Sequence, residues 1–169
     1  LFWDDEAGGL FTTGHDGERL ITRSKDVIDS AVPSANGNAA AALLRLSALV
    51  GDDRYRQRAE DILRLLAGPI AEHTLAFSRS LDAVDLASYP ITEIAVVGDR
   101  PDMVRAVQAR YLPGAVLAWG EPYPSPLFES RSEGLAYVCR DYACEAPVAT
   151  VEGLVSQLMS TASVSPGTG

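Results

Sequence analysis

Apolar positions follow a helical spacing through the first half of the chain, beginning near residue 39. Residues 39–50 are apolar on nearly every side, and a helix of that kind has to be enclosed by protein. Ser34 or Asn36 would cap its start, and Gly51 follows its end, as glycine commonly does after a helix. The pattern therefore predicts an interior helix.

Two further helices are predicted downstream. Apolar residues recur at helical spacing from Tyr55 to Leu66 with charged residues between them, and Gly68–Pro69 is predicted to end this one-sided helix. A third, mostly apolar helix is predicted over residues 70–87. Enclosed and one-sided helices alternate in stacked helical hairpins, and repeated hairpins form toroids or solenoids. Three helices cannot close such a ring alone.

The spacing changes after residue 90. Residues 92–98 form an apolar run rich in β-branched side chains, 101–111 have a helical pattern, and 115–119 form a second apolar run. Strand, helix and strand at this spacing predict a βαβ unit with parallel strands. A third strand is predicted at 136–139 and a closing helix at 150–159.

The start of the chain predicts a β-hairpin, because residues 9–13 and 19–23 alternate apolar and polar around a Gly/Asp loop. The fold class expected is mainly α with a smaller α/β part. We expect helical hairpins and the β-hairpin in residues 1–90, a small α/β module in 91–160, and a flexible tail in 161–169.

Composition narrows the possible partners. The chain has 169 residues, a net charge of −9 and a pI near 4.6, and this charge repels nucleic acid and anionic membrane surfaces. It has no apolar run of the roughly 20 residues that a membrane-spanning helix needs. We therefore expect a cytoplasmic protein with neither nucleic acid nor a membrane as partner. Lys25 is the only lysine.

Polar side chains gather just before the predicted interior helix. Lys25, Asp26, Asp29, Ser34 and Asn36 fall within twelve residues of one another. The free N–H groups of a helix start attract anions and sugar oxygens, so these residues are a candidate site for a polyhydroxylated ligand. The alternative is structural: Ser34 and Asn36 cap the helix, and Lys25 pairs with a carboxylate.

An aromatic and acidic segment offers a second candidate. Trp3 precedes acidic residues 4–6, and such a combination can bind sugars. Cleavage of a glycosidic bond needs two carboxyl groups about 5–10 Å apart, one with a raised pKa. Asp26 and Asp29 are candidates for this catalytic role, with Trp3 as a ligand-binding platform. The alternative is that residues 4–6 form the solvated edge of the hairpin.

Histidine and cysteine give few further candidates. His15 and His73 are too isolated to predict a metal site. Cys139 and Cys144 are separated by four residues, unlike the Cys-x-x-Cys of thiol oxidoreductases. They are either structural or reduced, or joined in an exchangeable disulfide, or part of a metal site. We expect no metal and no cofactor.

Several motifs together resemble a known family. Residues 25–36 contain Lys-Asp-x-x-Asp-x-Ala-x-Pro-Ser-x-Asn, residues 94–98 are Ile-Ala-Val-Val-Gly, and residues 136–148 contain Ala-Tyr-Val-Cys, a second cysteine and Pro-Val. These resemble the C-terminal part of the DUF255 thioredoxin-domain proteins, the family of spermatogenesis-associated protein 20. The resemblance implies a longer parent with a thioredoxin-like domain and an (α/α)6 toroid similar to N-acylglucosamine 2-epimerases and six-hairpin glycosidases.

The resemblance leaves three functions open. The toroid binds or processes a carbohydrate-like polar metabolite, or it is a non-enzymatic scaffold presenting the thioredoxin domain, or the parent is a thiol–disulfide oxidoreductase whose active cysteines lie upstream. If the parent is an enzyme, it is a sugar isomerase or hydrolase, and this piece alone is inactive. Its expected partners are a small polar metabolite and the remainder of the parent chain.

Overall fold

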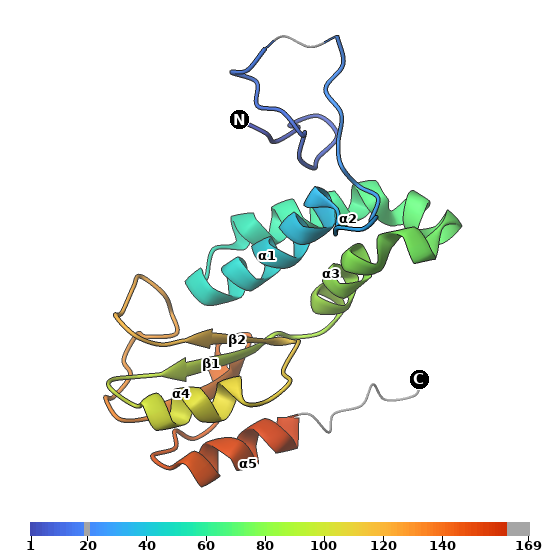
Figure 1. The fold of residues 1–169 in the computed structure, drawn as a ribbon. Coiled ribbons are helices and arrows are strands. Elements are labelled where there is room, and N and C mark those ends of the chain that lie inside the picture. Colours follow the sequence, from blue (N-terminus) through green and yellow to red (C-terminus); the bar gives the residue numbers. More distant parts are fainter. Residues whose placement is uncertain (19–20, 162–169) are drawn as a thin grey trace. The chain divides into compact units, whose positions relative to one another are not determined.

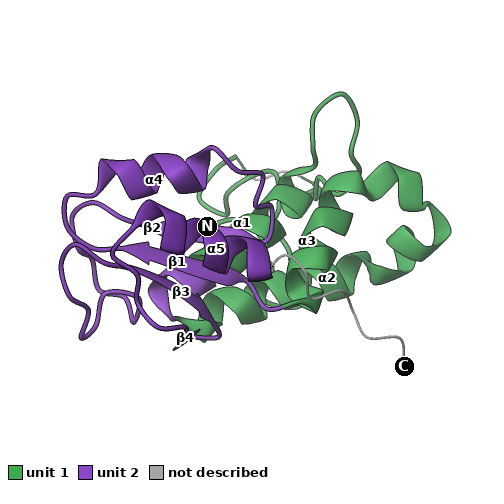
Figure 2. Cartoon of the chain, turned by 90° about the horizontal axis from the view of Figure 1, so that it is seen from below, with its two compact units in different colours: residues 1–47, 52–89 green, residues 48–51, 90–169 purple. Residues whose placement is uncertain are grey.

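The chain divides into two compact units in the computed structural model, which describes residues 1–18 and 21–161 (Figures 1 and 2). Unit 1 comprises residues 1–47 and 52–89, and unit 2 comprises residues 48–51 and 90–169. The tail expected to be flexible lies outside the described residues from 162 onward. Across the described ranges, no helix has the length and apolar character needed to cross a membrane.

Unit 1 is helical, as the spacing of its apolar residues predicts. Its helices are α1 (Ala35–Val50), whose last residues from Ala48 onward belong to unit 2, α2 (Asp53–Glu72), the 3-10 turn η1 (Thr74–Phe77) and α3 (Ser78–Ser88). The Ser34 hydroxyl accepts a hydrogen bond from the Gly37 N–H at 3.3 Å, so the cap predicted for α1 is confirmed. This cap starts the helix at Ala35, four residues before the predicted start.

The predicted boundary between the second and third helices is wrong. α2 continues through Gly68–Pro69 to Glu72, because one proline removes only one backbone donor and these positions are exposed. The predicted helix over 70–87 is therefore replaced by the end of α2, the 3-10 turn and α3. Leu75, one of the apolar residues of the predicted helix, is 95% exposed.

α1 is buried along one side only. Ala40, Ala41 and Leu44 are fully buried, whereas Ala42 and Leu46, on the opposite side, are exposed. The described residues therefore enclose α1 on one side only, and its full enclosure by further protein stays a prediction. An apolar side of α1 faces solvent.

The predicted β-hairpin at the start of the chain is also wrong in its first strand. Leu10 makes only an isolated bridge with Trp3, and residues 9–13 form no strand. Gly8 and Gly9 have φ of +72° and +81°, which interrupts the extended backbone. Residues 19–20 of the predicted second strand lie outside the described residues.

Unit 2 contains the predicted βαβ unit in a mixed sheet. Its elements are β1 (Thr92–Val96), α4 (Pro101–Gln108), β2 (Ala115–Ala118), β3 (Ala136–Arg140), β4 (Ala143–Cys144) and α5 (Val151–Thr161). The strand order is β2-β1-β3-β4. β1 and β2 are parallel, which confirms the βαβ prediction, whereas β3 pairs antiparallel with both β1 and β4.

The two faces of this sheet are covered by different elements. Successive residues of a strand point to opposite faces, so each strand contributes side chains to both. On one face Ile94 and Val138 pack against α4 and α5, through Met103 and Leu154 among others (Figure 1). On the other face Tyr137, Cys139 and neighbouring residues pack against the loop that joins β2 to β3, which contributes Leu127.

Candidate functional site

The N-terminal segment of unit 1 is attached to α1 through a buried asparagine. Asn36 is fully buried. Its Oδ1 accepts from the Leu10 N–H at 2.7 Å, and its Nδ2 donates to the carbonyl oxygens of Leu10 at 2.9 Å and Asp26 at 2.8 Å. The side chain therefore pairs with Leu10 as a neighbouring strand would. Asn36, predicted as a ligand-binding residue, has these donors and its acceptor engaged within the protein.

The two carboxylates predicted to be catalytic cap helices. Asp26 accepts from the Ala35 N–H at 2.9 Å. Asp29 accepts from the Ser34 N–H at 2.8 Å through one oxygen and from the Arg79 N–H at 2.6 Å through the other. It thereby joins the starts of α1 and α3. The catalytic role of Asp26 and Asp29 stays a prediction.

The electrostatics of Asp29 favour its ionised form. Burial raises the pKa of its carboxyl, but the hydrogen bonds from the Ser34 and Arg79 N–H groups outweigh this, and the pKa lies below its ordinary value. A general acid in glycoside hydrolysis needs a raised pKa. The environment of Asp29 therefore suits a capping carboxylate or a base better than a proton donor.

Lys25, the single lysine, fastens the acidic turn at the start of the chain. Its Nζ lies 2.8 Å from Asp4 Oδ2 and donates at 2.5 Å to the Gly8 carbonyl oxygen. It also lies 5.1 Å from the centre of the Phe11 ring. Asp4 Oδ1 accepts from the backbone N–H groups of Glu6 and Ala7. Lys25 and Asp4 are only 15% and 16% exposed.

The contacts of Asp4 predict a pH dependence. Hydrogen bonds from Lys25 and from the Glu6 and Ala7 N–H groups lower its pKa from 3.8 to about 2. A lowered folded-state pKa means that the carboxylate stabilises the fold above its unfolded pKa, and that this contribution disappears as the pH falls from about 4 to about 2. Urea unfolding should show wild type losing its advantage over Asp4→Asn within that window. A constant difference between the two proteins would contradict this assignment.

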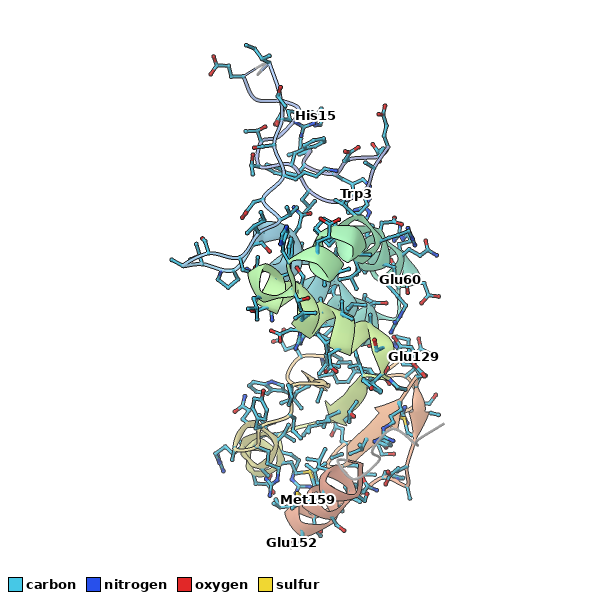
Figure 3. The ribbon with its side chains drawn as sticks, turned by 90° about the vertical axis from the view of Figure 1, so that its right-hand side faces the viewer. Trp3, His15, Glu60, Glu129, Glu152 and Met159 are labelled. Carbon is cyan, nitrogen blue, oxygen red and sulfur yellow. A yellow bond between two sulfur atoms is a disulfide. The ribbon has the colours of Figure 1, made fainter. Side chains whose placement is uncertain are left out.

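Trp3 lines two depressions of this segment. Figure 3 shows Trp3 beside α2 and His15 farther out on the same N-terminal segment. Two depressions, of about 450 and 690 Å³, share Trp3 and acidic residues 4–6. The first also meets α2 at Asp61, Arg64 and Leu65, and the second is also lined by Leu1, Phe11, His15, Arg23 and Arg58.

The charged groups around Trp3 differ in whether they form ion pairs. The Arg58 guanidinium lies 5.2 Å from the centre of the Trp3 ring. Within residues 1–18 and 21–161, Asp5, Glu6 and Arg58 form no ion pair. The site therefore combines an aromatic ring with carboxylate acceptors and a guanidinium donor that are available to a ligand. Lys25, Asp26, Asp29, Ser34 and Asn36 do not line it.

The two cysteines lie together in unit 2. Cys139 of β3 and Cys144 of β4 are directly opposite in the antiparallel ladder and form a disulfide. The sequence leaves this bridge open, and its exchange with other thiols stays a prediction. Arg131 Nη2 lies 2.9 Å from Cys144 Sγ and 3.9 Å from Cys139 Sγ. No group of three or more potential metal ligands occurs among the residues that the structure describes.

Comparison with known proteins gives relatives of one kind. The chain is 28% identical to human spermatogenesis-associated protein 20 over 165 residues. The chain is similar to spermatogenesis-associated protein 20. Its identity to the rat and mouse proteins is 26% and 25%. Each alignment covers 88% of this chain and 21% of the relative, so the chain spans about a fifth of their length. No family model matches the chain.

This similarity confirms that the motifs resemble spermatogenesis-associated protein 20, while the thioredoxin-like domain and the toroid stay predictions. It leaves the site residues to be judged from geometry. Sequence reasoning missed Arg58 and Arg131, because each is one of 13 arginines and nothing in its local pattern sets it apart. Arg58 lies on the charged side of the predicted one-sided helix, but residue spacing does not show that the N-terminal segment covers it.

Proposed function

We propose that unit 1 binds a carbohydrate-like polar small molecule in the depression around Trp3. The proposal rests on the charged groups around the Trp3 indole. Asp5, Glu6 and Arg58 line the depression and form no ion pair among the described residues. Binding sites for small polar ligands combine an apolar surface with a few polar groups that fix orientation. A sugar ring offers C–H groups to an aromatic face and hydroxyls to carboxylates and guanidinium.

We propose binding for this chain and not turnover. Glycoside chemistry needs a pair of carboxyls, one of them protonated. Asp26 and Asp29 are used as helix caps, and neither lines the depression. Any catalytic group would come from the rest of a longer protein.

We propose that the protein partner of unit 1 is another part of the same, longer polypeptide. The chain spans 21% of its relatives, and the resemblance in its motifs implies a helical toroid and a thioredoxin-like domain in the parent. Two observations support neighbouring helices: the apolar side of α1 that carries Ala42 and Leu46 faces solvent, and both residues are of the kind that toroid helices bury against one another.

Intrinsic fluorescence tests the binding proposal directly. The chain has two tryptophans, so a Trp119→Phe background leaves Trp3 as the single reporter. Glucose, glucosamine and N-acetylglucosamine are then titrated at millimolar concentrations. We expect at least one of them to change the Trp3 emission in a saturable way, because a sugar seated on the indole changes its solvent contact.

Two arginines of α2 provide a matched comparison. Arg58→Gln should weaken saccharide binding by about tenfold, since it removes the donor over the indole at a cost near that of one charged hydrogen bond. Arg56→Gln, two residues earlier and outside the depression, should not change it. Absence of saturable change with all three sugars, or equal effects of both substitutions, rejects the Trp3 site and favours a scaffold.

A further inference from the structure

The disulfide of unit 2 joins two strands that already pair with each other in a hairpin. Cys139 and Cys144 are register partners across β3 and β4, separated by a turn of four residues. A disulfide restricts the unfolded chain most when it closes a long loop. Here the loop is very short, and the ladder of β3 with β4 holds it in the folded state. The bridge therefore contributes little to holding the fold together.

The turn between the cysteines is held by contacts other than the bridge. Asp141 and Tyr142 have positive φ, +48° and +60°, a conformation that non-glycine residues keep only where their surroundings impose it. The Tyr142 N–H donates to Glu93 Oε2 at 2.9 Å, and the Tyr142 hydroxyl donates to the Ala48 carbonyl at 3.2 Å. Glu93 is 3% exposed. These contacts would keep the two sulfurs side by side after reduction.

The guanidinium of Arg131 lies against the two sulfurs. Arg131 approaches them at 2.9 and 3.9 Å through Nη2, and its guanidinium carbon stands 4.5 Å from the centre of the Tyr137 ring. Along residues 1–18 and 21–161, Arg131 forms no ion pair, and its buried Nε has no hydrogen-bond partner. A cation beside sulfur favours the thiolate over the thiol.

The two cysteines differ in access. Cys139 is 2% exposed and packs against the sheet and its covering loop, whereas Cys144 is half-buried on the short edge strand β4. We propose that Cys139 and Cys144 form a thiol–disulfide exchange site for a dithiol of another protein domain. Cys144 is the sulfur attacked, and Cys139 is the leaving thiolate, whose sulfur lies 3.9 Å from Arg131 Nη2.

The exchange is balanced as a two-electron transfer. A thiolate of the incoming dithiol attacks Cys144 Sγ; the bond between the two cysteines breaks, and its electron pair stays on Cys139 Sγ. The second thiolate of the dithiol then attacks its own partner sulfur in the mixed disulfide and releases Cys144 as a thiolate. The dithiol becomes a disulfide, and its two protons pass through solvent to Cys139 and Cys144.

Two single-cysteine variants test which sulfur is reached. Cys139→Ser and Cys144→Ser both abolish the bridge, so any loss of stability is shared and the comparison concerns access alone. With the aromatic disulfide 5,5′-dithiobis(2-nitrobenzoate), the Cys144 thiol of the first variant should react at least about tenfold faster than the Cys139 thiol of the second. Equal rates, or faster reaction of Cys139, would overturn the assignment of Cys144 as the attacked sulfur.

Reduction of the 169-residue chain tests whether the bridge exchanges in the folded protein. Dithiothreitol should reduce it without urea, as measured by alkylation and mass, while the far-UV circular dichroism stays unchanged. Reduction only after unfolding would overturn the proposal.

Charge at position 131 provides the last comparison. Arg131→Gln should slow reduction by about threefold because the leaving thiolate loses its cation, and Arg131→Lys should retain most of the wild-type rate. If Arg131 acted only through packing, the reduction rates of the two variants would not follow the charge at position 131. A wild-type rate in Arg131→Gln would remove Arg131 from the exchange site. The cysteine comparison does not depend on this result, nor on sugar binding in unit 1.

Discussion

Replacing Asn36 with alanine is expected to destabilise unit 1 by about 3 kcal/mol, because three side-chain hydrogen bonds are lost, each worth about 1 kcal/mol, and their partners stay buried. The partners left behind are the Leu10 N–H and the carbonyl oxygens of Leu10 and Asp26. The N-terminal segment should detach from α1 as a consequence. The measurement is urea unfolding followed by Trp3 fluorescence in the Trp119→Phe background, which reports on unit 1.

Asn38 provides the matched control for this prediction. It lies two residues farther along α1 and is exposed, with one side-chain hydrogen bond from Arg79 Nε at 2.8 Å. Asn38→Ala should cost less than about 1 kcal/mol. Asn36→Asp keeps the shape but turns a carboxylate oxygen toward two carbonyl oxygens, so it should be at least as harmful as Asn36→Ala. Similar small losses for Asn36→Ala and Asn38→Ala would show that Asn36 does not hold the segment.

Local patterns predict unit 2 better than the start of unit 1. The apolar run at 92–98 and the helix after it carry their own signal, because a buried strand and a one-sided helix bury side chains in a recognisable order. The segment at 9–13 fails because Leu10 is satisfied by Asn36, 26 residues away, and not by a neighbouring strand. A short alternating run predicts the need for a partner but not which partner supplies the hydrogen bonds.

The same reason limits prediction of the site. The polar stretch from Lys25 to Asn36 lies at the start of α1, close to where it was predicted, and Ser34 caps that helix as expected. That Asp29 also reaches the start of α3, 50 residues away at Arg79, depends on how the helices pack. The charges near Trp3 depend in the same way on α2 passing beneath the N-terminal segment. Neither of these two contacts between elements can be inferred from the spacing of residues along the chain.

Replacing Asp29 is expected to destabilise unit 1 somewhat less than replacing Asn36 does. Asp29→Ala removes the acceptor at the start of both α1 and α3, and the loss of two such caps should cost about 2 kcal/mol of unfolding free energy. Asp29→Asn keeps a single acceptor oxygen and should cost about half as much. The carboxylate of Asp26 serves one exposed cap, so Asp26→Ala should cost about 1 kcal/mol.

Acid titration separates the capping role of Asp29 from a catalytic one. The pKa of Asp29 is lowered from 3.8, so its contribution is present above that pH and is lost as the pH falls below it. The difference between wild type and Asp29→Asn in urea unfolding should therefore shrink below about pH 4. A carboxylate kept only for chemistry would give the opposite result: Asp29→Ala would unfold at the wild-type urea concentration at every pH, and the double cap would then not support unit 1.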